Sequence, residues 1–312
     1  MIIEKSPLAW GLWRIQQLLT NLHLTSNKQP SKRVDHDLVN QEFERRRARS
    51  KNGEVYLIGA GPGDAELLTL KAYRLIQQTD VVMFDWLVNP DIIKMIPDHV
   101  ERIFVGKKCG QHSMQQADIC QLMVEVAQSG KNIVRLKGGD PAIFARAAEE
   151  CDILAQHQID FAIVPGITAA SGASAYAGIP LTHRECAQSV RFITAHLKSA
   201  RDEPNWRALV AGASACHGET LVFYMGLKRI DTIMQRLQKH GLSSNTAVAV
   251  IDQATTTQQQ VCVGTLENIA QRVRTENFQG PAITIVGEVV NKRHQVNLSL
   301  LSNTTVPLHA KA

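Results

Sequence analysis

Asp85 and Lys107 have side chains and positions suited to proton transfer. Asp85 closes the apolar run DVVMFD (80–85), and Lys107 comes directly after the run IFVG. Side chains at the ends of such runs reach the sheet edge where chemistry occurs in α/β proteins. A carboxylate there can accept a proton, and a lysine can donate one. A helix cap for Asp85 and simple solvation for Lys107 are the structural alternatives, and the sequence leaves both open.

The stretch LIGAGPGD (57–64) carries three glycines directly after an apolar run. A dinucleotide-binding loop needs the pattern GxGxxG, in which backbone N–H groups face a diphosphate. Here Asp64 takes the place of the third glycine, and Pro62 has no N–H to donate. Because an acidic side chain also repels phosphate, the loop does not indicate a phosphate site. It predicts a tight turn with Asp64 capping the next helix, and its glycines allow a ligand to approach the backbone.

Two further loops follow apolar runs in the same way. In VRLKGGDPAIF (134–144), Gly138 and Gly139 supply backbone freedom, and Asp140 before proline is suited to cap a helix. The stretch VPGITAASGASAYAGIPLTHR (164–184) is dense in Gly, Ala and Ser, which suits close approach of a ligand and tight helix packing equally. Loops of this kind that meet at one sheet edge indicate a small-molecule pocket.

Positive charge gathers near the predicted loop ends. A single lysine or arginine is usually only solvated, so the inference depends on the whole group. Its members are Lys108, Arg135, Lys137, His183, Arg184, Arg191 and His196. With a formal net charge of +5 and only 5% aromatic residues, the chain favours an anionic small ligand over a nucleic acid.

A regular alternation of strand and helix patterns positions these residues. Such alternation predicts a parallel sheet with crossover helices, whose ligands bind beyond the carboxyl ends of the strands. The predicted strands are 55–59, 80–85, 103–105, 161–166 and a strand with its following loop at 132–140. The predicted helices are 67–78, 115–130 and 142–158.

The pattern changes after THRE (182–185), where short strands are separated by single helices, as in a mixed sheet. The predicted strands there are 189–197, 220–226, 246–251, 259–266 and 282–290, with a helix at 230–241. We therefore predict an α/β fold of two domains. The predicted parts are an N-terminal extension at 1–53, an N-terminal domain at 54–183, a C-terminal domain at 184–292 and a tail at 293–312.

The extension differs from the rest of the chain. Residues 8–24 have apolar residues at helical spacing, and the basic run FERRRARSKNG (43–53) follows. A surface helix and a flexible linker are favoured over a membrane-surface or partner-binding helix. The six cysteines show no CxxC pair and no zinc spacing, so we expect reduced thiols and no metal. Without a bilayer-length apolar run or a signal-peptide pattern, the expected location is the cytoplasm.

From about Gly53 to Val290 the chain closely resembles the uroporphyrinogen-III C-methyltransferases. These enzymes are S-adenosylmethionine-dependent tetrapyrrole methyltransferases of sirohaem and cobalamin synthesis. The similar stretches are GAGPGD, FDWLV, VGKKCGQHS, VRLKGGDPAIF, VPGITAASGASAYAGIPLTHRECAQSVRFITAHLK, VFYMGL and PAITIVGEVV. The resemblance implies the tetrapyrrole methyltransferase fold, with the active site in a cleft between the two domains of a homodimer. It also implies S-adenosylmethionine as co-substrate, with S-adenosylhomocysteine as product.

The resemblance further implies residue roles. Asp85 becomes the proton acceptor and Lys107 the proton donor, while His183, Arg184 and Arg191 bind the substrate carboxylates. The implied cofactor contacts are Pro62, Gly138, Gly139, Asp140, Ile143, Thr168, Ala169, Met225, Ala254 and Ala282. The implied reaction methylates uroporphyrinogen III at C2, giving precorrin-1, and then at C7, giving precorrin-2. The product would feed sirohaem or cobalamin synthesis.

The chain departs from the family pattern at two places. FARAAEE (144–150) replaces FGRGGEE, and Trp86 in FDWLV replaces the arginine of YDRLV. These changes bear on substrate fit and rate more than on the fold. A catalytically weak tetrapyrrole-binding protein is therefore one alternative, and an NAD-dependent oxidoreductase is the generic α/β alternative. The extension lacks a dinucleotide loop, unlike the dehydrogenase and ferrochelatase module that precedes this domain in fused sirohaem synthases.

Overall fold

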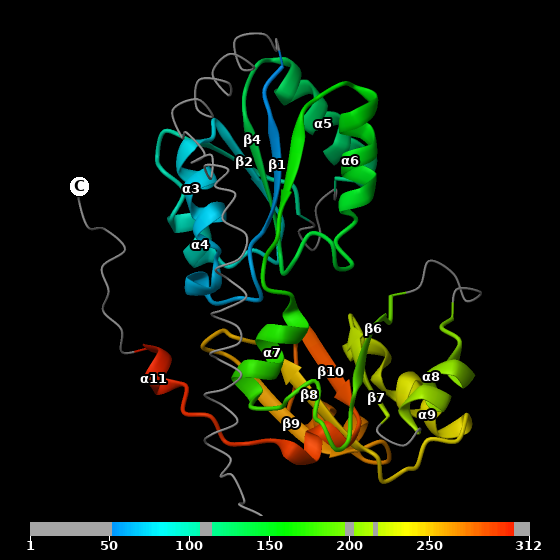
Figure 1. Ribbon diagram of the computed structural model, residues 1–312. Helices are drawn as coiled ribbons and strands as arrows, with labels where there is room; N and C mark the ends of the chain where they lie inside the picture. Colours follow the sequence, from blue (N-terminus) through cyan, green and yellow to red (C-terminus); the bar gives the residue numbers. More distant parts are fainter. Residues whose placement is uncertain (1–51, 107–113, 197–202, 215–217, 303–312) are drawn as a thin grey trace, which may run out of the picture. The chain divides into compact units, whose positions relative to one another are not determined.

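The computed structural model describes residues 52–106, 114–196, 203–214 and 218–302. These residues form two five-stranded sheets, each covered by helices (Figure 1). The first sheet is parallel and the second is mixed, as the sequence predicts, so the predicted α/β fold class is confirmed.

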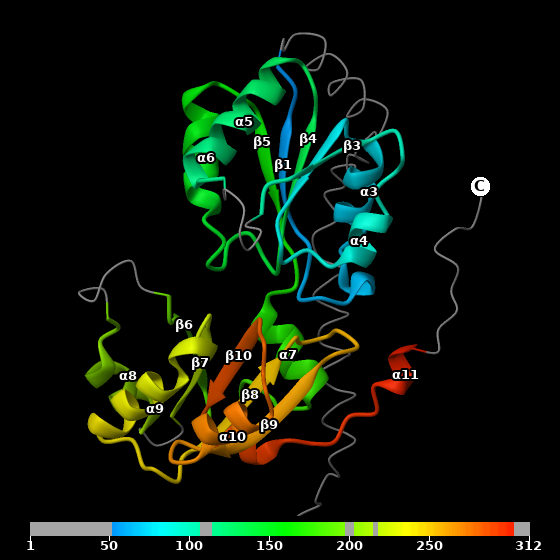
Figure 2. The same cartoon turned by 180° about the vertical axis from the view of Figure 1, so that it is seen from behind.

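The first sheet has the strand order β3-β2-β4-β1-β5, and all its strands run parallel. Helices α3 and α4 cover one face, and α5 and α6 cover the other (Figures 1 and 2). Its elements are β1 (Val55–Gly59), η1 (Ala65–Leu67), α3 (Leu70–Gln78), β2 (Val81–Phe84), α4 (Pro90–Lys94), β3 (Glu101–Phe104), α5 (Gln116–Gln128), β4 (Ile133–Lys137), α6 (Ala147–Gln156) and β5 (Phe161–Val164).

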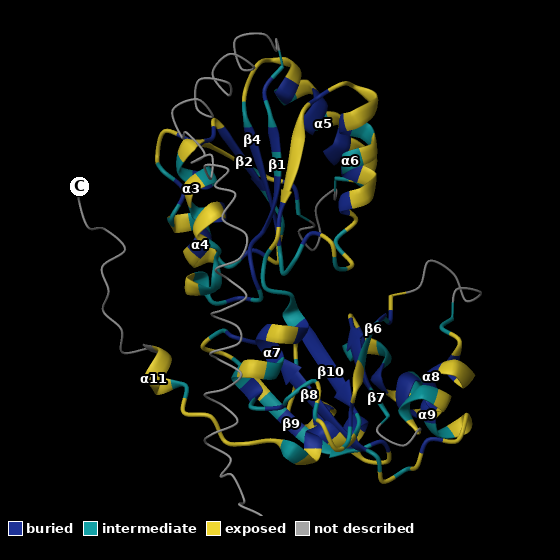
Figure 3. Ribbon diagram, viewed as in Figure 1, coloured by how far each residue is buried: buried dark blue, intermediate teal, exposed yellow. Residues whose placement is uncertain are grey.

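The central strands of this sheet are buried on both faces because their apolar side chains alternate between two cores. In β1, Val55 and Leu57 pack with α5 and α6, whereas Ile58 packs with α3 and α4. The edge strand β5 is different, since Phe161 and Ile163 are exposed (Figure 3). Burial on both faces fixes the register and holds the carboxyl ends of β1, β2 and β4 side by side.

The second sheet has the order β6-β7-β10-β8-β9, with β6 parallel to β7 and the remaining neighbours antiparallel. Helices α8, α9 and α10 pack on one face, and α7 and η4 pack on the other. Its elements are α7 (Ala169–Ala177), β6 (Ser189–Thr194), α8 (Trp206–Ala213), β7 (Glu219–Tyr224), η3 (Leu227–Arg229), α9 (Ile230–Lys239), β8 (Ala247–Asp252), β9 (Gln260–Thr265), α10 (Ile269–Thr275), β10 (Ala282–Val286), η4 (Glu288–Lys292) and α11 (Ser299–Ser302).

The helix predicted at 142–158 is wrong in its first turn. The helix α6 begins only at Ala147, because Phe144 and Arg146 have φ angles of 52° and 58°, in the left-handed region. Asp140 therefore caps no helix; its side chain accepts hydrogen bonds from Ala142 N and Gly166 N instead. Helices α4, α7, α8 and α10 were not predicted, since they are short or rich in small residues.

Several expectations concern residues outside the described ranges. The helix predicted at 8–24 and nearly all of the basic run 43–53 lie there, as does Lys107. The predicted domain boundary at 183/184 falls between α7 and β6, and it stays a prediction. Among the described residues, no helix is long and apolar enough to cross a membrane. In the same ranges, no group of His, Cys, Asp and Glu forms a metal-binding cluster.

Candidate active site

Loops from both sheets line one cavity of about 1720 Å³. The loops after β1, β2 and β4 contribute to it, together with the start of α7 and the segments next to β7, β8 and β10. Asp85 lies in this lining. So do all ten predicted cofactor contacts, namely Pro62, Gly138, Gly139, Asp140, Ile143, Thr168, Ala169, Met225, Ala254 and Ala282. The structure thus brings these residues together, while their individual roles stay predictions.

Four glycines, Gly59, Gly61, Gly139 and Gly166, allow the loops after β1, β4 and β5 to approach one another. A Cβ atom added to Gly59 would lie 2.6 Å from both Gly139 O and Gly166 N. Gly61 and Gly139 exchange backbone hydrogen bonds of 3.1 and 2.7 Å, which join two of the loops as a short bridge. The sequence predicts that such glycines let a ligand approach the backbone. At Gly59 the atoms that approach most closely are instead backbone atoms of the other two loops.

Asp64 ties the first loop to the elements of the second sheet. Its Oδ1 accepts a hydrogen bond from Glu66 N at 2.9 Å, so the predicted capping role is confirmed, at the short helix η1. Its Oδ2 accepts from the Tyr176 hydroxyl at 2.7 Å, and its backbone N–H donates to Thr255 Oγ1 at 2.9 Å. The second and third contacts span long sequence separations and had no sequence signal.

The Asp64–Tyr176 hydrogen bond predicts a pH effect on stability. Partial burial and the neighbouring carboxylate raise the pKa of Tyr176 above its ordinary value near 10. A raised pKa means that the folded state holds this proton more tightly than the unfolded state. The contribution of Tyr176 is therefore complete below pH 10 and is lost as the pH rises above it. In urea titrations from pH 8 to 11.5, wild type should lose stability more steeply above pH 10 than Tyr176→Phe; identical slopes would contradict this.

The Asp85 carboxylate is held by two donors at the cavity wall. Its Oδ1 accepts from Leu87 N at 3.0 Å, and its Oδ2 lies 3.3 Å from Nη2 of Arg135. A quarter of the side chain stays exposed. The helix-cap alternative is wrong, because Asn89 caps the following helix α4. Asp85 is thus an oriented and accessible carboxylate, as a proton acceptor needs to be.

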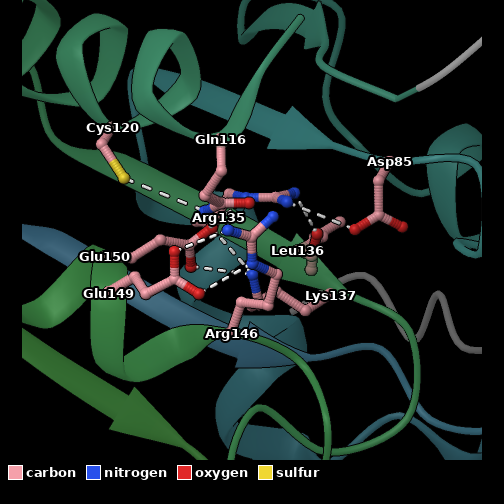
Figure 4. Close-up of polar contacts among 9 residues, drawn as sticks. All are labelled: Asp85, Gln116, Cys120, Arg135, Leu136, Lys137, Arg146, Glu149 and Glu150. Atoms are coloured by element: carbon pink, nitrogen blue, oxygen red, sulfur yellow. Dashed lines mark hydrogen bonds and ion pairs between the residues drawn. The ribbon is translucent and has the colours of Figure 1, made fainter. Parts of the chain in front are cut away.

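Behind Asp85 lies a buried network of charges (Figure 4). Both oxygens of Glu150 accept from Nζ of Lys137 at 2.8 Å, and Oε1 also accepts from Nε of Arg135 at 3.4 Å and from Gln116 at 3.1 Å. Burial and the nearby Arg135 lower the pKa of Lys137, while Glu150 opposes this shift. The sequence predicts positive charge near the ligand at Arg135 and Lys137, and both side chains do line the cavity. Both also pair with carboxylates, Lys137 with Glu150 and Arg135 with Asp85 and Glu150, and Glu150 had no sequence signal.

The predicted carboxylate-binding residues do not lie in the cavity lining. His183 forms a tight turn with Ala187, and Arg191 pairs with Glu219 at 2.8 Å. Arg184 is likewise absent from the described lining residues. Besides Arg135 and Lys137, the cationic or titratable side chains among the described lining residues include Arg146, His157, His196 and Lys228. Three members of the predicted basic group thus line the cavity, namely Arg135, Lys137 and His196.

Apolar side chains form the accessible part of the wall. Trp86 is 70% exposed and Met225 is 51% exposed, although both line the cavity. Phe144 packs edge-on against Tyr224 at 5.0 Å, and the Tyr224 hydroxyl shares a hydrogen bond of 2.6 Å with Thr168. Large exposed apolar side chains around a cavity are typical of ligand-binding surfaces.

The buried carboxylate of Asp252 lies next to another part of the cavity lining. Asp252 at the end of β8 is 1% exposed and accepts hydrogen bonds from Gln279 N at 3.1 Å and Gly280 N at 2.6 Å. Gln279 and Gly280 line the cavity beside Ala282. Asp252 thus fixes the segment that leads into β10. Its place at the end of an apolar strand, like that of Asp85, is the signal that could have identified it.

Only one alanine of FARAAEE reaches the cavity. Ala145 lines it, whereas Ala147 is buried in the core as the first residue of α6. Ala148 is not among the described lining residues. The possible crowding of a ligand by this departure from the family pattern is therefore confined to Ala145.

Comparison with known proteins places the chain in a family. A sequence profile described as Tetrapyrrole (Corrin/Porphyrin) Methylases matches residues 54–270. A siroheme synthase from Pseudomonas aeruginosa (strain LESB58) is 53% identical over 249 residues, which are 80% of this chain and 52% of that protein. A siroheme synthase from Azotobacter vinelandii is 53% identical over 244 residues, 78% of this chain and 52% of that protein. The chain thus spans about half the length of these curated relatives.

Solved structures agree with this placement. The uroporphyrin-III C-methyl transferase from Thermus thermophilus, in complex with S-adenosyl homocysteine, is similar with a TM-score of 0.65 and 35% identity. The match covers 77% of this chain and all of that one. A cobalt precorrin-4 methyltransferase is similar with a TM-score of 0.66 and 27% identity, over 76% of this chain and 95% of that one. These findings favour methyl transfer over the oxidoreductase alternative. The chain belongs to the tetrapyrrole methylases and is a methyltransferase of that family.

Proposed function

We propose that this protein transfers methyl groups from S-adenosylmethionine to carbons C2 and C7 of uroporphyrinogen III, forming precorrin-1 and then precorrin-2. The observation that carries the proposal is the single cavity lined by Asp85 and by all ten predicted cofactor contacts. The similar methyltransferase from Thermus thermophilus was solved with S-adenosyl homocysteine, the product form of this co-substrate.

The size of the cavity supports a site for two ligands. Its volume of about 1720 Å³ exceeds the roughly 300–1,000 Å³ of ordinary small-molecule pockets. The uncharged loop residues Gly138, Gly139, Thr168 and Ala169 line it together, and the two glycines leave the backbone open to a ligand. S-adenosylmethionine supplies an electrophilic methyl group on its sulfonium. No phosphate needs to be bound, which agrees with Pro62 and Asp64 in the first loop.

The residues of the chain position the substrate and handle its proton. Methylation of a ring carbon leaves a proton to be removed, and the oriented Asp85 carboxylate is the proposed acceptor. Lys107, the proposed donor, lies outside the described residues. Uroporphyrinogen III carries eight carboxylates, and the described lining residues include the cations Lys228 and Arg146, the latter paired with Glu149, and the imidazole of His196. His183, Arg184 and Arg191 stay candidates for carboxylates that extend beyond it.

Trp86 provides a prediction about substrate affinity. Its exposed indole lies in the cavity lining and can cover a pyrrole ring. Trp86→Ala should raise KM for the tetrapyrrole about 10-fold, while Trp86→Phe keeps most of the contact. The Kd for S-adenosylmethionine should not change. Leu70→Ala removes another exposed apolar side chain, away from the cavity lining, and is the matched control. An unchanged KM in Trp86→Ala would contradict this role.

The proposed function is tested by incubating the purified protein anaerobically with S-adenosylmethionine and uroporphyrinogen III. Mass spectrometry should detect a product that carries one and then two added methyl groups. Binding of both ligands without any methyl transfer would overturn the proposal and favour the alternative of a catalytically weak binding protein. Of the departures that motivate this alternative, Ala145 and Trp86 are among the described lining residues.

The cellular setting is part of the proposal. The siroheme synthase relatives support a product that feeds sirohaem synthesis, and the cobalt precorrin-4 methyltransferase neighbour makes cobalamin synthesis the other route. We also propose that the protein is located in the cytoplasm and forms a homodimer. Light scattering of the purified protein would test the dimer.

A further inference from the structure

Glu150 is the most deeply buried charged group of the network behind Asp85. Its side chain is 0% exposed, and it does not line the cavity. Four hydrogen bonds from three side chains reach its two oxygens: two from Lys137, one from Arg135 and one from Gln116. A carboxylate with this many donors has a fixed orientation.

Arg135 links Glu150 to the cavity. Its Nε donates to Glu150, its Nη1 to Leu136 O at 2.7 Å, and its Nη2 to Asp85 Oδ2. The guanidinium is planar, so partners on three of its nitrogens fix its plane and its position. The Nη2 donor that faces Asp85 is therefore placed by contacts made on the buried side (Figure 4).

The charges of the network balance. Two carboxylates, Asp85 and Glu150, face two cations, Arg135 and Lys137. Removing the charge of Glu150 leaves two buried cations and one carboxylate, and both cations then compete for Asp85. Asp85 is thereby drawn away from the position in which it meets the substrate.

Stability alone does not explain such a network. Replacing a buried ion pair by apolar residues of similar volume is often neutral or stabilising. Of the two carboxylates in the network, only Asp85 is among the described residues that line the cavity, and Arg135 and Lys137 line it too. We infer that Glu150 is a positioning residue for methyl transfer, which fixes Arg135 and through it the Asp85 carboxylate. The inference rests on the proposed function, in which Asp85 accepts the proton.

The test compares Glu150→Gln with wild type in kcat, in KM for uroporphyrinogen III and in Kd for S-adenosylmethionine. We expect kcat to fall about 10- to 100-fold, since small displacements of a reacting group cost this much. The KM and the Kd should stay within about 3-fold. In the Asp85→Asn background, Glu150→Gln should cause no further loss, because the group that it positions is gone. Glu125→Gln removes an exposed carboxylate that bonds Gln121, and it should match wild type.

Two further variants keep the test decisive if Glu150→Gln folds poorly. Glu150→Met with Lys137→Met removes both members of the buried pair, and Arg135→Lys keeps the charge but loses the planar fork. Both should show the same selective loss of kcat. A wild-type kcat in any of the folded variants, or losses that multiply in the Asp85→Asn background, would overturn the inference. Absence of methyl transfer by wild type would instead refute the proposed function.

Discussion

Asp85→Asn should lower kcat for methyl transfer by about 10²- to 10⁴-fold, the range typical of a lost general base. The amide keeps the size of the side chain and can still accept from Leu87 N, so the loop should keep its conformation. The Kd for S-adenosylmethionine should not change, because the predicted cofactor contacts lie on other loops. Stopped-flow methyl transfer and calorimetric titration measure the two quantities separately.

The control for Asp85→Asn is Asp91→Asn on the neighbouring helix α4. Asp91 is exposed and pairs with Lys94 at 2.7 Å, a surface pair of small energetic value. This variant should keep the wild-type kcat and Kd. If Asp85→Asn weakened cofactor binding as much as it slowed turnover, Asp85 would have a structural role and not a chemical one.

Gly59→Ala should lower the free energy of unfolding by about 3 kcal/mol, the upper range for overpacking a tight site. The added Cβ atom would lie 2.6 Å from Gly139 O and Gly166 N, which are backbone atoms and cannot move aside separately. The loops after β1, β4 and β5 must then separate. Because Gly139 is a predicted cofactor contact, affinity for S-adenosylmethionine should fall as well. Urea unfolding and calorimetric titration measure the two effects.

Gly241→Ala is the matched control for this substitution. Gly241 has no atom within 4 Å of an added Cβ, but its φ of 107° is unfavourable for alanine. This variant should lose about 1 kcal/mol through backbone strain and keep the wild-type cofactor Kd. Equal losses of stability in the two variants would show that close packing of the three loops contributes nothing.

Strand positions could be predicted from the sequence because burial on both faces leaves continuous apolar runs. The runs at 55–59 and 80–85 correspond to β1 and β2 within two residues, and Asp85 comes directly after β2. The start of α6 could not be predicted in this way. Alanine-rich FARAAEE favours a helix, but Arg146 has a left-handed φ, so the helix begins only at Ala147.

Pairings between distant side chains are the part of the site that the sequence could not supply. The pairing of Arg135 and Lys137 with Glu150 had no sequence signal, because Glu150 lies on a different element. Asp64 and Tyr176 are 112 positions apart, yet they form a hydrogen bond. Charge and spacing along the chain do not contain this information, since it arises only when α6 and α7 pack against their sheets.

The ring carbons that receive the methyl groups can be identified by product analysis with a labelled donor. The purified protein would be incubated anaerobically with uroporphyrinogen III and S-adenosylmethionine whose methyl carbon is ¹³C. We predict that NMR of the product shows labelled methyl groups bonded to C2 and C7, with C2 labelled first. Label on a carboxylate oxygen or at other ring carbons, or no label in the tetrapyrrole, would overturn the proposed methyl transfer.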